Sequence, residues 1–284
     1  MKNKLTAILS AVLAAALIFA SGCGSKPEET KPEAETTTQA ESSAVSQTQE
    51  AKPEETTLPA QSSNLQTVPE ETTLEAETTA PSAPETVQEI VALFNESANR
   101  IKPEASKIVK NYEKRTVNED KLVIPEAVES AGRSLLTSVM KDDTDPIVYD
   151  TKEDIKNEFL VPDQSYVSKL KADSVEKATC TDNGKEYVVY LKLKTQKNPT
   201  AGVGVGAVCD VIEAAEVAEG ASFVEKFTTE YYNCEVKATI DKASGRVTHI
   251  NYTTPLVLEV TVNMFGTHDG AVGLTFEKDY TITY

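Results

Sequence analysis

The sequence predicts an α+β fold in which N-terminal amphipathic helices pack on a curved antiparallel β-sheet. Residues 86–160 repeat apolar side chains at helical spacing, and residues 165–284 mostly alternate apolar with polar side chains. Helical spacing indicates helices with one buried stripe, whereas alternation indicates strands with one packed face and one wet face. An Asn-Gly pair at 183–184 adds the turn of a hairpin. We therefore expect residues 86–284 to form a single domain.

The helical part begins at Thr86-Val87-Gln88-Glu89, which has the form of a capping box. A first helix is expected from there to Pro103, a second over residues 104–115, a third from Pro125 to about residue 141, and a short fourth over residues 152–159. The residues expected to face inward are Val87, Ile90, Val91, Phe94, Ala98 and Ile101 in the first helix, Ile108, Val109 and Tyr112 in the second, and Ala127, Val128, Ala131, Leu135, Leu136 and Val139 in the third.

The sheet part begins with a hairpin whose strands, residues 177–181 and 186–194, flank Asp182-Asn183-Gly184. Residues 207–232 are expected to be helical, because Ser222-Phe223-Val224-Glu225 has the form of a second capping box. The remaining strands are expected over residues 234–241, 246–253, 256–264, 272–276 and 280–284.

The N-terminus has the pattern of an export signal. Lys2 and Lys4 precede an unbroken apolar run over residues 5–19, and Ala20-Ser21-Gly22-Cys23 closes the segment. The apolar run is shorter than the roughly 20 residues that a helix needs to cross a bilayer. Residues 1–22 are therefore expected to be a signal peptide.

The small residues before Cys23 resemble the lipobox of bacterial, Gram-positive-type lipoproteins. This resemblance implies that the Cys23 thiol receives a diacylglyceryl group with acyl chains such as palmitate. It also implies that cleavage makes Cys23 the new N-terminus, and that the chain is anchored on the outer face of the cell membrane. Two acyl chains anchor stably, since each buried methylene contributes about 0.8 kcal/mol. The alternative is an ordinary signal peptide cleaved nearby, which would leave Cys23 as a free thiol.

Residues 23–85 are expected to be a disordered stalk behind the lipidated Cys23. The segment after Cys23 consists almost entirely of Thr, Glu, Pro, Ala, Ser and Gln, with 13 acidic residues against three lysines. Such a composition cannot bury enough apolar surface to offset the entropy of ordering. As a flexible coil, it would hold the domain roughly 45 Å from the membrane. A tail that a partner recognises is the alternative.

The charge of residues 86–284 argues against nucleic acid as a partner. This part holds 23 basic and 32 acidic residues and lacks a cluster of Lys or Arg. Gly202-Val203-Gly204-Val205-Gly206-Ala207 matches a dinucleotide loop in form, but it does not directly follow a parallel strand, and a flexible apolar loop or lid is the expected role. No cofactor is expected.

Few other residues suggest chemistry. Cys180 and Cys234 lie on expected strands and are the preferred disulfide pair, with Cys209 buried; the alternative leaves all three thiols unpaired.

No cysteine or histidine spacing predicts a metal site. His249 and His268 stand far apart in the sequence. The acidic residues Asp142, Asp143 and Asp145 lack the spacing of a calcium loop, so a solvated helix end is expected there.

No motif indicates catalysis, and we expect no enzymatic activity. The leading hypothesis is a membrane-anchored binding or interaction module whose partner is a lipid, an envelope component or a protein. Helices on a curved sheet in a lipoprotein are also similar to the LolA/LppX-like lipid carriers, which implies a hydrophobic ligand held between sheet and helices. A cell-envelope hydrolase is the least favoured alternative. The residues expected to line the cavity of a carrier, or else to form an ordinary core, are Val236, Ile240, Leu258, Val260, Leu274 and Phe276.

Overall fold

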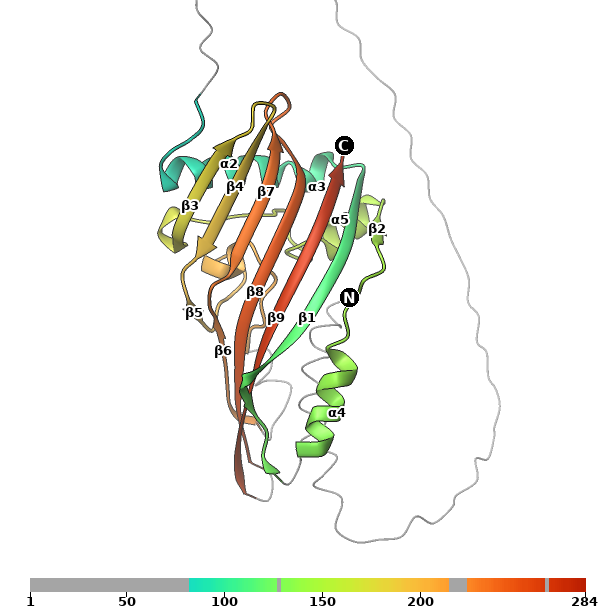
Figure 1. Ribbon diagram of the computed structural model, residues 1–284, viewed down its shortest axis with the longest axis vertical. Coiled ribbons are helices and arrows are strands. Elements are labelled where there is room, and N and C mark those ends of the chain that lie inside the picture. Colours follow the sequence, from blue (N-terminus) through green and yellow to red (C-terminus); the bar gives the residue numbers. More distant parts are fainter. Residues whose placement is uncertain (1–81, 127–128, 215–223, 264–265) are drawn as a thin grey trace, which may run out of the picture. The chain divides into compact units, whose positions relative to one another are not determined.

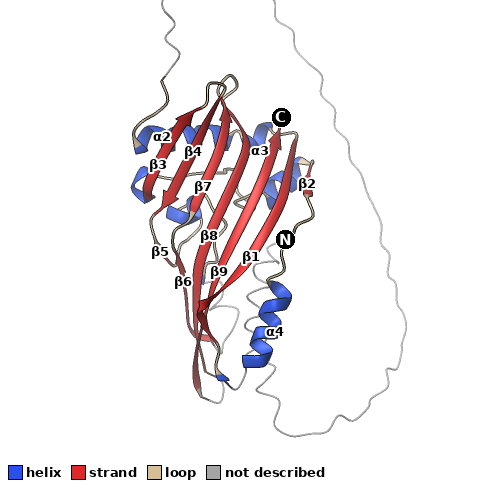
Figure 2. Ribbon diagram, in the orientation of Figure 1, coloured by secondary structure: helices blue, strands red, loops and turns tan. Residues whose placement is uncertain are grey.

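The computed structural model describes residues 82–126, 129–214, 224–263 and 266–284. These residues form one large antiparallel sheet with a few helices on one side (Figures 1 and 2). The predicted signal peptide, Cys23 and nearly all of the predicted stalk lie outside the described residues. Among the helices of the described residues, none is long and apolar enough to cross a membrane.

The elements follow one another along the chain as four helices, two short 3-10 turns and nine strands within the described residues. The helices are α2 (Val87–Asn99), α3 (Ile101–Glu104), α4 (Glu129–Val139) and α5 (Lys152–Glu158), and the 3-10 turns are η2 (Ala172–Ser174) and η3 (Gly204–Ala207). The strands are β1 (Lys107–Val123), β2 (Ile147–Tyr149), β3 (Val175–Asp182), β4 (Glu186–Leu193), β5 (Gln196–Lys197), β6 (Val224–Tyr231), β7 (Glu235–Asp241), β8 (Arg246–Asn263) and β9 (Thr267–Thr283).

The sheet runs in the order β2-β1-β9-β8-β7-β4-β3, and β6 pairs with the far half of β8. The long strand β8 changes its partner on one side at Pro255. Before this residue, β8 pairs with β7 as far as Thr253, and after it β8 pairs with β6 from Leu256 onward. Proline has no N–H to donate, and its carbonyl oxygen accepts a hydrogen bond from the Tyr232 N–H (3.1 Å) in the turn between β6 and β7.

The hydrophobic core lies between the sheet and the helices. The predicted capping box of α2 is confirmed, since the Thr86 hydroxyl accepts from the Glu89 N–H while Glu89 accepts from the Thr86 N–H. Ile90, Phe94 and Ala98 lie at most 1% exposed on one stripe of α2, which contacts β3 and β8. In Figure 1, α2, α3 and α5 all lie behind the strands, on the same side of the sheet.

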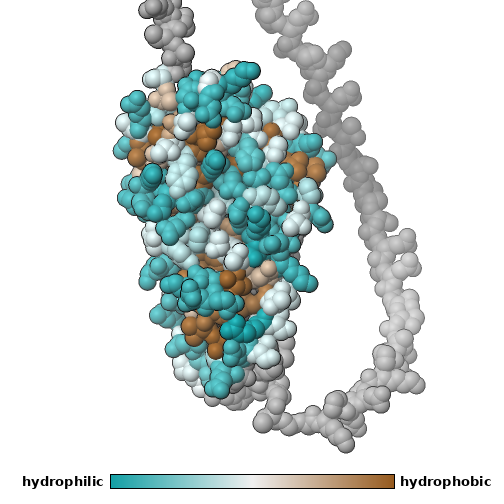
Figure 3. Space-filling view, viewed as in Figure 1, coloured by the Kyte–Doolittle hydropathy of each residue, from teal (hydrophilic) through white to brown (hydrophobic). Residues whose placement is uncertain are grey.

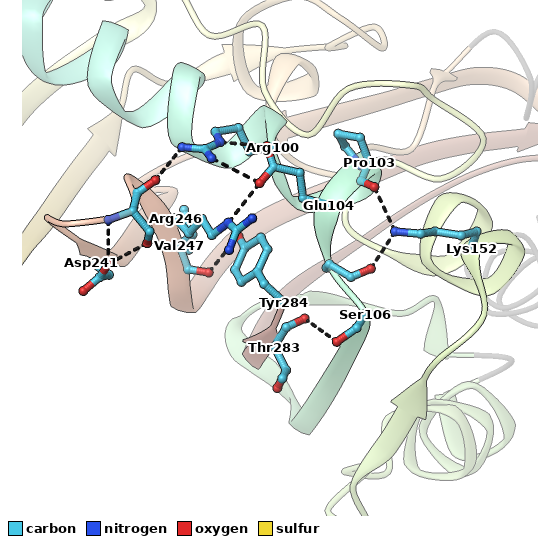
Figure 4. Close-up of polar contacts among 12 residues, drawn as sticks. Arg100, Pro103, Glu104, Ser106, Lys152, Asp241, Arg246, Val247, Thr283 and Tyr284 are labelled. Atoms are coloured by element: carbon cyan, nitrogen blue, oxygen red, sulfur yellow. Dashed lines mark hydrogen bonds and ion pairs between the residues drawn. The ribbon is translucent and has the colours of Figure 1, made fainter.

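A polar clamp joins the helices to one end of the sheet (Figure 4). Arg100 and Arg246 both donate to Glu104, at 2.8 and 2.9 Å, and Arg246 stacks on the ring of Tyr284 with 4.7 Å to its centroid. Arg100 also donates to the Ser244 carbonyl oxygen (2.6 Å) in the β7–β8 turn. The junction of α2 and α3 is therefore fixed to the β7–β8 turn and to the end of β9.

The predicted α+β fold class, with N-terminal amphipathic helices packed on the sheet, is wrong. Strands make up 48% of the described structure and helices 22%, and the longest described helix, α2, has 13 residues, so the protein is mainly an antiparallel β-sheet. The largest error is residues 104–115, predicted as a helix, because residues 107–123 form the long strand β1, between β9 and the short edge strand β2.

Buried charges concealed β1 in the sequence. Its inward side chains include Ile108, Lys110 and Glu113, so the inward positions do not read as an apolar alternation. The Lys110 ammonium donates to Glu113 (2.9 Å) and to Asp143 (3.3 Å), and Arg115 donates to Glu113 (3.0 Å). Charged side chains can occupy such positions when they are paired with one another.

Three further predictions need correction, and several are confirmed. The predicted helix over residues 207–232 is wrong where it is described, because residues 224–231 form strand β6. The strands predicted on either side of Pro255 form the single strand β8, and those on either side of residue 278 form β9. The structure confirms helix α5, strand β7 and the β3–β4 hairpin, in which Gly184 has a φ of 84°.

Lys102 is a buried cation that holds the loop after α5. Its ammonium donates to the carbonyl oxygens of Lys156, Val161 and Gln164 at 3.2, 2.7 and 2.9 Å. Burial lowers the pKa of Lys102 to about 8. Replacing Lys102 with Met is expected to lower the free energy of unfolding by about 2 kcal/mol, because three carbonyls lose a donor while the desolvation of one charge is relieved. Urea unfolding at pH 7 measures this change.

The pH dependence provides a second measurement on the same variant. An unfolded chain keeps the Lys102 proton up to its ordinary pKa of 10.5, whereas the folded chain releases it near 8. Unfolding free energy therefore rises with pH between about 8 and 10.5 in the parent, and this contribution should be missing from Lys102→Met. Lys107→Met is the control, because Lys107 is exposed and should change stability by less than about 0.5 kcal/mol. Equal pH profiles for parent and Lys102→Met would refute the role given to this ammonium.

Candidate functional site

The second face of the sheet is a polar surface. Alternate side chains of β4, β7, β8 and β9 point away from the core, and in Figure 1 no described helix crosses these strands on the side toward the viewer. The same view in Figure 3 is mostly hydrophilic, with a few apolar patches. We refer to this side as the open face.

Three rows of directly paired residues cross the open face at right angles to the strands. Each row takes one residue from β4, β7, β8, β9 and β1, because the antiparallel registers align. The first row is Val188, Thr239, His249, Thr281 and Val109; the second is Tyr190, Lys237, Asn251, Asp279 and Tyr112; the third is Lys192, Glu235, Thr253, Glu277 and Lys114.

A β-bulge in β1 brings two neighbouring side chains to the middle of this surface. The register with β9 shifts between Lys110 and Tyr112, so Asn111 and Tyr112 both contact open-face residues while Lys110 and Glu113 point to the core. A bulge interrupts the ladder of a sheet and is typically found where a side chain must be re-aimed. Here it brings an amide and a phenol to the same carboxylates of β9.

Asp279 is the centre of the resulting network. It is 8% exposed, although it lies on the open face. Its carboxylate accepts from Asn111 Nδ2 (2.7 Å), from His249 Nε2 (2.9 Å) and from Asn251 Nδ2 (3.4 Å). Three donors from two neighbouring strands therefore satisfy a carboxylate that would otherwise be costly to bury. We call Asn111, Tyr112, His249, Asn251, Glu277 and Asp279 the Asp279 cluster.

Tyr112 links this carboxylate to the next one. Its hydroxyl donates to Glu277 (2.6 Å) and lies 3.4 Å from Asn251 Nδ2, and Lys114 lies over its ring, 4.7 Å from the centroid. The hydrogen bond to Glu277 raises the pKa of Tyr112 to about 12, so the phenol stays protonated at neutral pH.

The cluster retains hydrogen-bonding capacity that can serve a ligand. A carboxylate only accepts, so His249 Nε2 donates to Asp279, and Nδ1 makes no hydrogen bond to the described residues. The His249 side chain is 44% exposed. Within the part of the chain that the structure describes, Oε2 of Glu277 makes no hydrogen bond. The surface therefore offers fixed acceptors, including Asn251 Oδ1 and Glu277 Oε2, beside the ammonium groups of Lys114 and Lys237.

Sequence reasoning missed this cluster. It considered His249 alone, and it placed Tyr112 inward on a helix that does not exist. Asn251, Glu277 and Asp279 stood at outward positions of expected strands, where polar residues are ordinary. Only the strand register brings them together, and the bulge at Asn111 leaves no mark that a single sequence reveals.

The predicted Cys180–Cys234 disulfide is not formed, because the structure has Cys180, Cys209 and Cys234 as free thiols. Val189 stands opposite both Cys180 and Ala238, and Cys234 precedes Ala238 by four residues. This offset is roughly 13 Å along the strands and about 10 Å across them, well beyond the roughly 7 Å between Cα atoms that a disulfide spans. The expectation that Cys209 is buried is confirmed.

The apolar face proposed for a ligand forms core. Val236, Ile240 and Leu274 are at most 1% exposed, and Leu258 and Phe276 are 3% and 5% exposed. Val260 is partly buried and packs against the same core. A cavity for a lipid chain would leave its lining accessible, so these exposures favour the ordinary core that the sequence also allowed.

The glycine loop is a tight turn with no room at its centre. Gly202 N–H donates to the Gly206 carbonyl oxygen (2.7 Å), and Val205 N–H donates to Gln196 Oε1 (2.8 Å). A side chain on Gly206 would overlap the backbone carbonyl of Thr200. Close packing therefore accounts for these glycines without a nucleotide.

The acidic segment after α4 is not simply a solvated helix end. Asp143 pairs with the buried Lys110, and Asp142 accepts from the Arg115 N–H (2.8 Å). Among the described residues, no group of three or more His, Cys, Asp or Glu side chains is placed to hold a metal ion. His268 lies on β9 at an exposed position opposite Val262 of β8, 13 residues along β8 from His249.

Comparison with known proteins adds no relative. The chain matches no known protein family, no curated protein and no solved structure.

Proposed function

We propose that this chain is an extracytoplasmic lipoprotein, anchored by lipid on Cys23 to the outer face of the cell membrane, whose folded domain is a binding module. The observation that carries the binding role is the Asp279 cluster. It places a nearly buried carboxylate and its hydrogen-bonding partners on the side of the sheet away from α2, α3 and α5. A purely structural sheet face does not require a bulge that turns two polar side chains toward one carboxylate.

The arrangement favours binding over catalysis. The pair His249–Asp279 resembles the base and orienting group of a hydrolase, but its neighbours in the cluster are amides, a phenol and a second carboxylate. Cys209 and Cys234 are buried on the other side of the sheet, where they cannot serve as a nucleophile for His249. The His249 side chain is also nearly half exposed, whereas acid–base catalysis gains most in a site that excludes water.

The anchor and the stalk are supported by the sequence pattern of residues 1–85. Cys23→Ala is expected to move the protein from the membrane fraction to the culture medium, because two acyl chains supply the anchoring energy. Immunoblots of the two fractions give the result. Persistence of the Cys23→Ala chain in the membrane fraction would contradict anchoring through this residue.

The binding role is tested with isolated cell-envelope material. The purified full chain should co-sediment saturably with this material, and Asn251→Ala together with Tyr112→Phe should weaken the binding at least tenfold. Both changes are on the open face, so the fold should survive, and circular dichroism verifies it. Glu259→Gln is the matched control, because Glu259 is exposed on β8 outside the three rows. Unchanged binding by the double variant would exclude the Asp279 cluster as the binding site.

The lipid-carrier alternative makes an opposite prediction. A chain with a solid core should carry no lipid apart from its own anchor. Native mass spectrometry of Cys23→Ala, purified from cells, is therefore expected to give the mass of the protein alone. A stoichiometric lipid adduct on this variant would favour the carrier.

A further inference from the structure

The three rows on the open face are balanced in charge. Their 15 residues include the lysines Lys114, Lys192 and Lys237 and the carboxylates of Glu235, Glu277 and Asp279, so three positive charges meet three negative ones. The rest of the domain is acidic, since residues 86–284 hold 23 basic and 32 acidic residues. The three rows are thus a neutral area on a negative domain.

This balance distinguishes between classes of ligand. A polyanion would be repelled by the domain and would find no cluster of positive charge to offset the repulsion. A polycation would need several free carboxylates, but Asp279 is already saturated by Asn111, His249 and Asn251, and Glu277 keeps only one unbonded oxygen among the described residues. A large apolar ligand would have to cover these polar groups without satisfying them, which is costly. A neutral ligand rich in hydroxyl groups meets none of these objections.

The geometry of the second row suits an extended ligand of this kind. Tyr190 and Tyr112 stand at its two ends, four strand spacings or about 19 Å apart, with Lys237, Asn251 and Asp279 between them. Both tyrosines are half buried, and both hydroxyls are held by carboxylates, Tyr190 by Glu235 and Tyr112 by Glu277. Their rings are therefore held in place, and an ammonium, an amide and a carboxylate lie between them at the spacing of strands.

We infer that the open face binds a neutral glycan of the cell envelope, lying across the strands along the second row. Hydroxyl groups of the sugars bond to His249 Nδ1, donate to Glu277 Oε2 and Asn251 Oδ1, and accept from the ammonium of Lys237. The apolar face of a sugar ring packs on Tyr190, whereas Lys114 covers one face of the Tyr112 ring. The inference rests on the proposed function, because it names the ligand of the same site.

The test uses isolated cell walls from which other ligand classes are removed in turn. Walls are digested with protease, extracted with organic solvent to remove lipid, and treated with hydrofluoric acid to strip phosphate polymers. Co-sedimentation of the full chain should survive all three treatments. Chitohexaose, a neutral hexasaccharide, should compete for this binding, whereas heparin and polylysine should not compete at the same ionic strength.

Variants of row residues test whether wall binding depends on the three rows. Asn251→Ala and Tyr190→Ala should each weaken wall binding at least tenfold, and Glu259→Gln should bind like the parent. Binding that disappears after protease, solvent or hydrofluoric acid would overturn the glycan and point to a protein, a lipid or a phosphate polymer at the same cluster. Wall binding that chitohexaose leaves unchanged would likewise contradict a neutral glycan as the ligand. If the chain binds no envelope material in any form, the proposed binding function itself is contradicted.

Discussion

Glu113→Gln is expected to lower the free energy of unfolding by about 3 kcal/mol at neutral pH. The Glu113 side chain is 11% exposed and pairs with Lys110 and Arg115, and Lys278 stands opposite it on β9. Removal of the carboxylate charge leaves these three cations close together where little water reaches them. Asp143 is then the one remaining carboxylate that pairs with Lys110 among the described residues. Breaking a buried charge network from one side typically costs about 3–5 kcal/mol. Urea unfolding followed by circular dichroism measures the loss.

The same residue should make the protein sensitive to acid. Burial alone would raise the pKa of Glu113, but Lys278, Lys110 and Arg115 outweigh this effect and lower the pKa to about 2. An unfolded chain takes up the proton near the ordinary value of 4.5. The stabilisation from Glu113 is therefore complete above about pH 4.5 and is lost as the pH falls toward 2, by about 3 kcal/mol in total.

Glu129→Gln is the matched control for Glu113→Gln. Glu129 also pairs with an arginine, Arg133 (2.9 Å), but both side chains are about half exposed. Exposed pairs on a helix contribute about 0.3–0.5 kcal/mol. Similar losses in the two variants, or an unchanged acid profile in Glu113→Gln, would show that the buried network does not stabilise the fold.

Gly206→Ala is expected to cost about 3 kcal/mol. The new methyl group would overlap the backbone carbonyl of Thr200 and press on Val211. The backbone at Thr200 cannot move aside as a flexible side chain can. Two hydrogen bonds, from Gly202 N–H to Gly206 O and from Val205 N–H to Gln196 Oε1, hold the two sides of the loop in place. Overpacking of this kind costs about 1–3 kcal/mol, and the loss of a turn hydrogen bond adds to it.

The control for Gly206→Ala lies in the same loop. Val203 is 59% exposed, so Val203→Ala should change the unfolding free energy by less than about 0.5 kcal/mol. Thermal unfolding of the two variants beside the parent measures both. If Gly206→Ala unfolds like the parent, the loop can open at little cost, and a moving lid becomes the better description of residues 200–208.

Local signals in the sequence predicted local structure well. The capping box at Thr86 and the Asn-Gly turn at Gly184 depend on residues a few positions apart, and both are present in the structure. The failures concern distant partners. Strand β1 was read as a helix because Lys110 and Glu113 occupy inward positions, and their partner Asp143 lies some 30 residues away. A period-two pattern cannot reveal an inward charge whose partner is unknown.

The candidate site was hidden for a related reason. Asp279, Asn251 and Tyr112 are each unremarkable at an outward position of a strand. They become a cluster through the registers of β8, β9 and β1, and through the bulge that turns Asn111 toward Asp279. The disulfide prediction failed on register too, because Cys180 and Cys234 share a sheet but stand far apart along it.

The pairing of β1 with β9 has a consequence for how the chain reaches its final state. Lys107 stands opposite Thr283, so an early strand finds its neighbour only in the latest one. Loop closure over such a distance in sequence makes folding slow, and β1 has an unpaired edge until β9 has been made. A chain built this way stays unfolded while it is synthesised from its N-terminus. The export that we propose for this chain, through a membrane channel and before folding, would benefit from that delay.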